Sequence, residues 1–220
     1  MRRVLFKPLV LSFCAAALLL TSLTACVPLL IGGAAAGGTL MATDRRTSGA
    51  QLEDEGIALR GASRIRSNLG ERGHVNLTSY NRQVLLTGEV PTAQDKQLVE
   101  QIVSRVENVT SVVNEVVVAA NSSLTQRSSD LLISGRVKAQ LIDAPDLFSN
   151  AFKVVTERGT TYLMGRVTQR EADRATNLVR STSGVQKVIR IFDIISEDEL
   201  ARMLPTPAKP QPANATPAAK

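Results

Sequence analysis

The side chains that most often carry out chemistry in proteins are scarce in this chain. Among 220 residues there are one histidine, His74, and two cysteines, Cys14 and Cys26, too few for a four-ligand zinc site made of nitrogen and sulfur ligands. His74 stands alone in a predicted turn, where we expect it to be solvated. Glu171 and Asp173 are two residues apart on a predicted helix and point apart, so they are poor partners for acid–base catalysis. With no G-x-S-x-G motif and no Cys/His pair, the sequence predicts no enzyme, no metal site and no cofactor.

Cys26 has the clearest chemistry of these residues, because of what precedes it. Basic residues between positions 2 and 7 are followed by an apolar run from Leu9 to Leu23, the order of a secretory signal. The run ends in Leu23-Thr24-Ala25-Cys26, and a leucine, a small residue, an alanine and a cysteine in this order resemble a bacterial lipobox. The resemblance implies cleavage before Cys26, diacylglycerol on its thiol and acylation of the new amine.

A transmembrane helix and a buried cysteine are the alternatives to a lipid attachment site. The apolar run before Cys26 is short for a span of about 20 residues, and Pro28 interrupts any continuation. A buried cysteine is disfavoured because the run lies at the terminus behind basic residues. We therefore expect a signal peptide over residues 1–25. An aspartate at position 27 would resemble an inner-membrane retention signal, and Val27 implies transport to the outer membrane, where the protein would face the periplasm.

The net charge suggests an anionic partner, either nucleic acid or lipid. The whole chain carries +6, and loss of the predicted signal peptide with its three basic residues leaves +3. Seven Phe and Tyr residues and no Trp provide few rings on which bases could stack. Together with the predicted compartment, this disfavours nucleic acid as a partner.

Between two low-complexity ends the chain repeats itself. Residues 26–51 are rich in Gly and Ala and predict a flexible tether, whereas residues 203–220 carry five prolines among small and polar residues and predict a disordered tail. Val84–Val90 resembles Tyr162–Val167 at a spacing of 77 residues, and Val109–Asn114 resembles Val185–Arg190 at 76. A repeat of this length indicates two copies of one structural unit.

Each copy predicts the order helix, strand, strand, helix, strand. Ile57, Gly61, Ile65 and Leu69 form a helical stripe, a tight turn is expected near Asn81-Arg82, and Thr92 is expected to be an N-cap. The first copy is expected to have a helix at 53–69, strands at 75–79 and 84–90, a helix after Thr92 and a strand at 109–119. The second is expected to have a helix at 129–143, strands at 152–158 and 160–167, a helix at 169–182 and a strand at 185–195.

This pattern resembles the BON domain. In the first copy the resemblance is carried by Gly88, Val90, Asn108, Val109, Val112 and Asn114, and in the second by Gly165, Val167, Gly184, Val185 and Val188. Arg190 and Phe192 depart from the usual ending of the motif but keep the apolar alternation of the strand. The resemblance implies an α+β fold of two tandem BON domains, at 52–119 and 128–196, each with its helices on one face of a small three-stranded sheet.

The lipobox, the tether and two BON domains together resemble the dual-BON outer-membrane lipoproteins of the DolP type. That resemblance implies phospholipid binding and support of outer-membrane integrity, division sites included. The expected partner is anionic phospholipid of the phosphatidylglycerol or cardiolipin class. A protein-interaction adaptor for the outer-membrane assembly machinery is the alternative function.

The second copy is the better candidate for the lipid-binding face. Its residues 127–196 carry a net charge of +4, against −2 for residues 52–119. In its first helix Ile133, Val137 and Leu141 share one side and predict a buried face, which leaves a second apolar stripe without a core to enter. In the first copy the corresponding outward face is predicted to be polar, with Arg60, Ser63, Arg66 and Ser67. The predicted phospholipid-binding residues are Leu131, Leu132, Gly135, Arg136, Lys138, Ile142, Leu147 and Phe148. Packing of Leu131, Leu132 and Phe148 against the first copy remains the alternative for these side chains.

Overall fold

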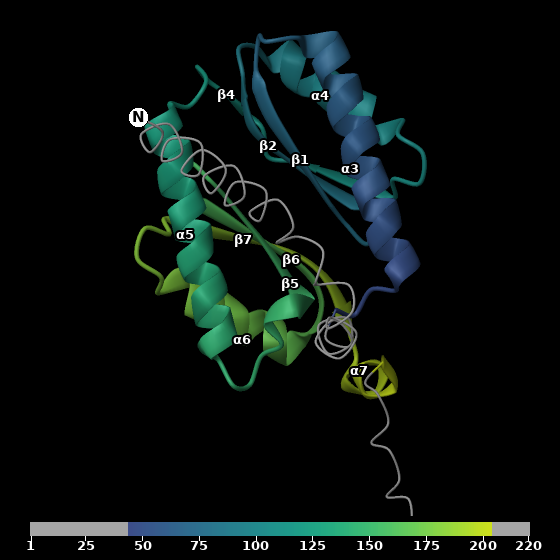
Figure 1. Cartoon of the computed structure of the whole chain (residues 1–220), viewed down its shortest axis with the longest axis vertical. Coiled ribbons are helices and arrows are strands. Elements are labelled where there is room, and N and C mark those ends of the chain that lie inside the picture. The colour runs from purple at the N-terminus through teal and green to yellow at the C-terminus, as the bar shows by residue number, and fades with distance from the viewer. Residues whose placement is uncertain (1–43, 204–220) are drawn as a thin grey trace, which may run out of the picture. The chain divides into compact units, whose positions relative to one another are not determined.

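The computed structural model describes residues 44–203 (Figure 1). The predicted signal peptide, Cys26, most of the tether and all but the first residue of the predicted tail lie outside the described residues. Within the described range, no helix combines the length and the apolar character needed to cross a membrane.

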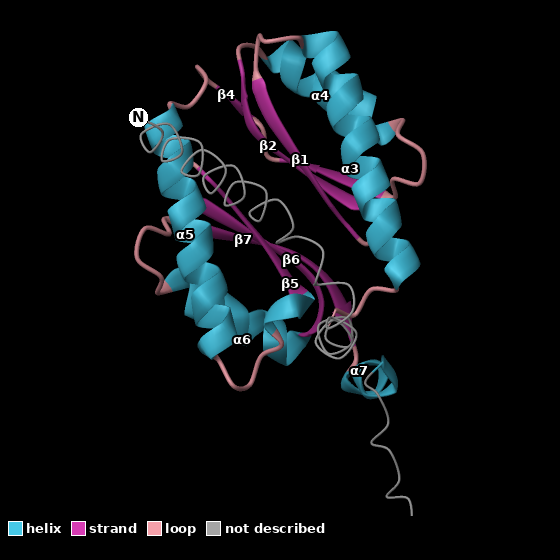
Figure 2. Ribbon diagram, viewed as in Figure 1, coloured by secondary structure: helices cyan, strands magenta, loops and turns pink. Residues whose placement is uncertain are grey.

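Each repeat has the predicted order helix, strand, strand, helix, strand, and the fold is α+β (Figure 2). The first repeat consists of α3 (Ser48–Leu69), β1 (His74–Tyr80), β2 (Gln83–Val90), α4 (Ala93–Ser104), β3 (Ser111–Asn114) and β4 (Val117–Val118). The second consists of α5 (Leu124–Asp143), a short 3₁₀ turn η2 (Ser149–Ala151), β5 (Phe152–Glu157), β6 (Thr160–Thr168), α6 (Gln169–Arg180) and β7 (Lys187–Ile195), and is followed by α7 (Glu197–Met203).

The two sheets have the same strand order, but the first has a fourth short strand, β4, which also pairs with β2, where three strands were predicted. An antiparallel hairpin, β1–β2 in the first repeat and β5–β6 in the second, is extended by a parallel strand that follows a helical crossover. The first hairpin turns at Asn81 and Arg82, with φ values of 50° and 66°. Positive φ at both central residues matches the twist of the flanking strands, so the predicted tight turn is confirmed.

Helices cover one face of each sheet, and each helix–sheet interface holds its own core. In the first repeat the predicted stripe is confirmed, because Ile57, Gly61, Ile65 and Leu69 are all buried. Gly61 lies so close to β1 that a Cβ atom there would overlap the side chain of Leu77. The second core has Ile133, Val137 and Leu141 of α5 packed with residues of β6 and α6, as predicted for the inward face of this helix.

The structure differs from the sequence prediction at four places. Helix α5 begins at Leu124 rather than at 129, because the Ser123 hydroxyl accepts a hydrogen bond from the Gln126 backbone N–H at 3.2 Å. Helix α3 begins at Ser48 rather than at 53, because the Thr47 hydroxyl accepts a hydrogen bond from the Ala50 backbone N–H at 3.1 Å. The predicted strand at 109–119 is broken into β3 and β4, since the Asn114 side chain accepts a hydrogen bond from the Val116 backbone N–H at 3.2 Å and turns the chain. Helix α7 was not predicted.

The other faces of the two sheets share a third apolar cluster. It contains Tyr80, Leu85, Tyr162, Met164 and Ile191, with the half-buried Val113, Val155 and Ile189 packed against it. A second buried face on each sheet joins the two repeats through their strands rather than through their helices.

Candidate functional site

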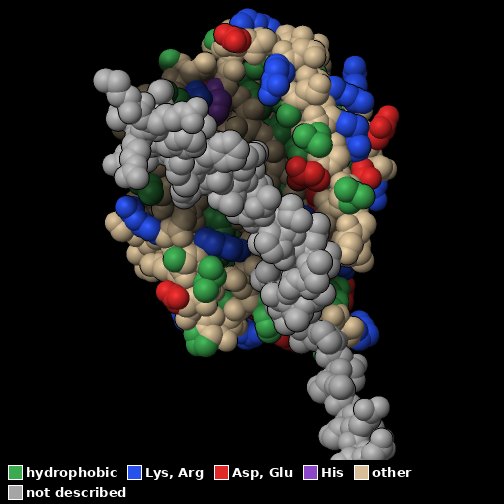
Figure 3. Space-filling view, in the orientation of Figure 1, with side chains coloured by type: hydrophobic (Ala, Val, Ile, Leu, Met, Phe, Trp, Pro, Cys, Tyr) green, Lys and Arg blue, Asp and Glu red, His purple; other side chains and the backbone are tan. Residues whose placement is uncertain are grey.

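The outward face of α5 carries the apolar side chains that the sequence analysis singled out. Leu131 is 74% exposed and Ile142 is 62% exposed, and Leu124 and Leu132 are exposed as well. Gly135 lies between them, with open space where a side chain would be. Figure 3 shows apolar and basic side chains close together on the part of the surface formed by the second repeat. The helix therefore has one buried and one uncovered apolar face.

Leu147 was predicted to belong to this face, and the prediction is wrong. Its side chain is 8% exposed and packs in the core of the second repeat. Pro145 follows the end of α5, and η2 then leads the chain back toward the sheet, which turns Leu147 inward. Phe148, the next residue, is 43% exposed, and the guanidinium of Arg45 lies 5.8 Å from the centre of its ring.

Lys138 lies on α5 and was predicted to bind phospholipid, but its ammonium group is turned toward the protein. Its Nζ donates hydrogen bonds to the backbone carbonyls of Ser149 at 2.6 Å and Phe152 at 3.4 Å. Burial, and then the charge of Lys153, lower the pKa of Lys138. Lys138 therefore ties α5 to the following loop. The basic side chains near α5 that face solvent more freely are Arg136 and Lys153.

The alternative in which these apolar side chains pack on the first repeat is not what the structure shows. Leu131 and Leu132 are largely exposed, and the apolar contact between the repeats is the strand cluster around Tyr80 and Tyr162. The first repeat also departs from its prediction, because Leu52 and Leu59 are exposed on α3, beside the polar residues expected there. Exposed leucines alone therefore do not distinguish the two repeats.

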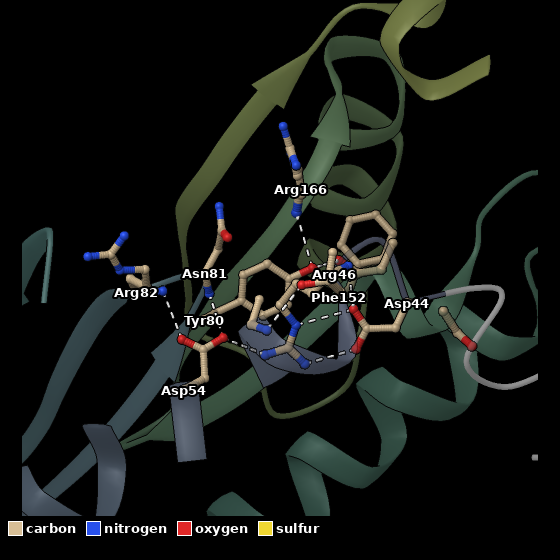
Figure 4. A network of polar contacts seen from close by, with 12 residues as sticks. Asp44, Arg46, Asp54, Tyr80, Asn81, Arg82, Phe152 and Arg166 are labelled. Carbon is tan, nitrogen blue, oxygen red and sulfur yellow. Dashed lines mark hydrogen bonds and ion pairs between the residues drawn. The ribbon is translucent and has the colours of Figure 1, made fainter. Parts of the chain in front are cut away.

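Two arginines just before α3 connect the repeats, and sequence reasoning placed both in the flexible tether. Arg46 forms ion pairs with Asp44 at 2.9 Å and Asp54 at 2.8 Å, and its guanidinium lies 4.3 Å from the centre of the Tyr80 ring (Figure 4). Arg45 binds both carboxylate oxygens of Glu171 at 2.7 Å. Residues 44–47 are thus part of the folded body, held on one side by α3 and on the other by α6.

Asp54 and Asp130 are a repeated structural device that sequence reasoning missed. Asp54 accepts hydrogen bonds from the backbone N–H groups of Asn81 and Arg82, at 2.7 and 2.8 Å. Asp130 does the same for the turn of the second hairpin, with Arg158 and Gly159 each at 2.9 Å. The sequence does indicate that the two aspartates are equivalent, since they are separated by 76 residues, the spacing of the repeat.

His74 was predicted to be solvated, and this too is wrong. It is the first residue of β1, its side chain is only 23% exposed, and its Nδ1 lies 3.5 Å from Oε2 of the fully buried Glu89. Glu157 of the second repeat completes a group with these two residues. The single histidine of the chain therefore lies between two carboxylates where the repeats meet.

Comparison with known proteins places these observations in a family. The BON domain profile matches residues 60–120 and 129–194. The chain is 35% identical to the Outer membrane lipoprotein DolP of Haemophilus influenzae over 172 residues, which cover 77% of this chain and 89% of that protein. It is 30% identical to the 21 kDa hemolysin of Actinobacillus pleuropneumoniae over 154 residues, covering 69% of this chain and 79% of that protein.

Among solved structures, the chain is similar to CdsD, a structural protein of the type III secretion system of Chlamydia trachomatis. The match has 13% identity and a TM-score of 0.26, and covers 64% of this chain and 96% of that one. At that TM-score the likeness says nothing further about this protein.

Proposed function

The chain belongs to the BON-domain family, among the outer-membrane lipoproteins of the DolP type, and from that premise we propose that its second BON domain binds anionic phospholipid through the exposed face of α5. The protein is lipid-anchored at the outer membrane and faces the periplasm. The proposal includes no catalytic activity, in keeping with the BON domains and with the relative's description as a lipoprotein. Cys26 remains the predicted attachment residue. Support of outer-membrane integrity, division sites included, is part of the proposal.

The uncovered apolar face of α5, combined with the basic side chains beside it, is the observation that carries the proposal. A buried Leu or Ile side chain contributes roughly 1.5–3 kcal/mol relative to an exposed one, so Leu131, Leu132 and Ile142 gain free energy if acyl chains cover them. Each Lys or Arg near an anionic surface adds about 1 kcal/mol, and Arg136 and Lys153 are exposed near this helix. The apolar and electrostatic contributions together support reversible binding rather than permanent insertion.

Reversible binding suits a protein that is already held at a membrane. Attachment through lipid raises the effective concentration of the α5 face at a nearby bilayer, so a weak contact is occupied much of the time. Because the basic contribution is electrostatic, salt is expected to weaken it. Anionic lipids are therefore preferred over zwitterionic ones.

Sedimentation with vesicles tests the proposal. Both cores lie within residues 44–203, so a chain that starts at Val27 keeps the folded body and carries no lipid of its own. We expect this chain to sediment with phosphatidylglycerol or cardiolipin vesicles, less so at high salt, and hardly at all with purely phosphatidylcholine vesicles. Leu131→Glu combined with Ile142→Glu is expected to abolish the binding.

The first BON domain provides a matched control. Leu52 and Leu59 on α3 are exposed to a similar degree, at 76% and 66%, so Leu52→Glu combined with Leu59→Glu changes the charge and the exposed apolar area in a similar way. We expect this double variant to bind vesicles like the unaltered chain. Equal losses from both domains, or undiminished binding of the α5 variant, would contradict the assignment to α5. Binding only in the presence of an outer-membrane assembly protein would favour the adaptor function instead.

A further inference from the structure

The contact between the two BON domains contains three potential metal ligands. His74 of β1, Glu89 of β2 and Glu157 of β5 each present one ligand atom, and these three atoms all lie within 4.8 Å of one another. Glu89 is fully buried, Glu157 is nearly so and His74 is half-buried. Buried carboxylates at this spacing repel each other unless a cation or a proton neutralises them.

Two of the three side chains have few polar contacts: the nearest charged atom to His74 Nδ1 is Glu89 Oε2 at 3.5 Å, and Glu157 has a single amide donor. Among the described residues, Nδ1 of His74 is buried without a hydrogen bond. Glu157 accepts one hydrogen bond, from Asn76 Nδ2 at 2.9 Å, and forms no ion pair within the described part of the chain. A bound cation would give both the imidazole and the carboxylate a partner.

The surrounding donors orient the two carboxylates. Arg158 Nη1 holds Oε1 of Glu89 at 3.3 Å, while Oε2 faces His74 and accepts two long hydrogen bonds from Ser122 at 3.2 and 3.3 Å. Asn76 holds one oxygen of Glu157. Outer-shell donors of this kind fix the orientation of carboxylate ligands in metal sites. The guanidinium of Arg158 is partly exposed, so it can move outward when a cation enters.

A cavity provides access to the cluster. It has a volume of about 420 Å³, and its lining includes His74, Asn76 and Glu157 together with Arg127 and Leu131. Two of the cluster's three members therefore border open space through which an ion and its water ligands can pass.

We propose that His74, Glu89 and Glu157 bind one divalent transition-metal ion, Zn²⁺ in the first place, and that this ion links the two BON domains. Zn²⁺ lies about 2.0–2.2 Å from imidazole nitrogen and carboxylate oxygen, so ligand atoms around one tetrahedral ion are about 3.3–3.6 Å apart. His74 Nδ1 and Glu89 Oε2 are already 3.5 Å apart, and side-chain rotation can bring Glu157, which lies within 4.8 Å of both, to the ion. Three protein ligands leave one position for water. The imidazole ligand favours Zn²⁺ over Mg²⁺ or Ca²⁺, which prefer oxygen. Counting only nitrogen and sulfur ligands in the sequence overlooked this combination.

Zinc titration of the full chain in detergent tests the proposal, provided that purification uses no polyhistidine tag. The chain has a single histidine, so its imidazole resonances report ligation without any substitution. We expect one Zn²⁺ per chain by calorimetry, a saturable shift of the His74 ring resonances and a higher melting temperature in excess Zn²⁺. Ca²⁺ and Mg²⁺ are expected to produce none of these effects.

Substitutions assign the ligands. His74→Ala and Glu157→Gln are each expected to weaken Zn²⁺ binding by more than about 100-fold, and Asn76→Ala by about 10–100-fold, as for outer-shell partners. Glu107→Gln removes an exposed carboxylate and is expected to leave the affinity unchanged. Unshifted imidazole resonances in the unaltered chain would overturn the proposal, whatever the stability of the variants. Equal affinity in His74→Ala, Glu157→Gln and Glu107→Gln would overturn it as well.

Discussion

Arg45→Ala is expected to destabilise the folded chain far more than the loss of a surface ion pair. Arg45 binds both oxygens of Glu171 at 2.7 Å, and the two side chains are 4% and 1% exposed. Arg45 also donates a hydrogen bond to the backbone carbonyl of Arg166 at 3.0 Å. Removing the arginine leaves the carboxylate of Glu171 buried without its cation.

The magnitude follows from that burial. Breaking a buried pair by removing one partner typically costs about 3–5 kcal/mol. For a folded unit of this size each kcal/mol lowers the melting temperature by about 2–4 °C, so the expected decrease is about 6–20 °C. Glu171 also accepts a hydrogen bond from the Thr168 backbone N–H at 3.0 Å in a capping box, which keeps part of its hydrogen bonding in the variant and favours the lower half of this range.

Thermal unfolding followed by circular dichroism measures the effect, and the same helix supplies the control. Arg190 pairs with Asp173 of α6 at 2.9 Å, but both side chains are about half exposed. Arg190→Ala is therefore expected to cost no more than about 1 kcal/mol. If the two variants melt at the same temperature, residues 44–47 do not fasten the domains and the reasoning is refuted.

The pH dependence gives a second readout of the same contact. Burial by itself would raise the pKa of Glu171, but the hydrogen bonds from Arg45 and Thr168 and the charge of Arg45 outweigh it and lower the pKa from its ordinary value of 4.5. A lowered folded pKa stabilises the protein above the unfolded pKa, and this contribution is lost as the pH falls through the folded value. The difference in stability between Arg45→Ala and the unaltered chain should therefore shrink below pH 4.5.

Four further outcomes are expected from other parts of the structure. Asp130→Ala removes two backbone hydrogen bonds to a carboxylate and should cost about 3 kcal/mol or more in denaturant unfolding. Gly135→Ala fills open space on α5 and should stabilise the chain by up to about 1 kcal/mol, whereas Gly88→Ala, at a φ of 109° and against the backbone of His74, should prevent folding, as judged by circular dichroism. In metal-free buffer the unaltered chain is expected to gain stability as the pH falls, because the raised folded pKa of Glu157 makes the folded chain take up a proton at a higher pH than the unfolded chain. Glu157→Gln should remove this gain, which denaturant unfolding at several pH values measures.

Periodicity predicted the helix–sheet cores because burial on a helix follows its 3.6-residue repeat. Ile57, Ile65, Val137 and Leu141 all lie where the pattern puts them. The same rule indicates the uncovered face of α5, since Leu131 and Ile142 lie on the side opposite the core. The pattern of one helix does not identify the partner of a polar side chain when that partner lies far away in the sequence.

Arg45 and Arg46 illustrate that limit. A polar Asp-Arg-Arg sequence after a Gly- and Ala-rich stretch is typical of a linker, and its order depends on Glu171, which is 126 residues away. The prediction that Leu147 is exposed was wrong for a related reason. A leucine in a loop is buried only if the loop folds back, as it does here through η2.

The shared strand cluster could have been found. Leu85 is followed by Leu86, and Leu163 by Met164, and consecutive apolar residues in a strand indicate that both faces of the sheet are buried. All four side chains are buried, with Leu86 and Leu163 in the helix-covered cores and Leu85 and Met164 between the repeats.

The environment of single residues on membranes tests the central claim most directly. A chain starting at Val27 contains no cysteine, so Leu131→Cys and Leu59→Cys each provide one site for a solvent-sensitive fluorophore. With phosphatidylglycerol vesicles, we predict a blue-shifted and brighter emission at position 131 and no change at position 59. An unchanged spectrum at position 131, or an equal shift at both positions, would contradict lipid binding by α5 of the second BON domain.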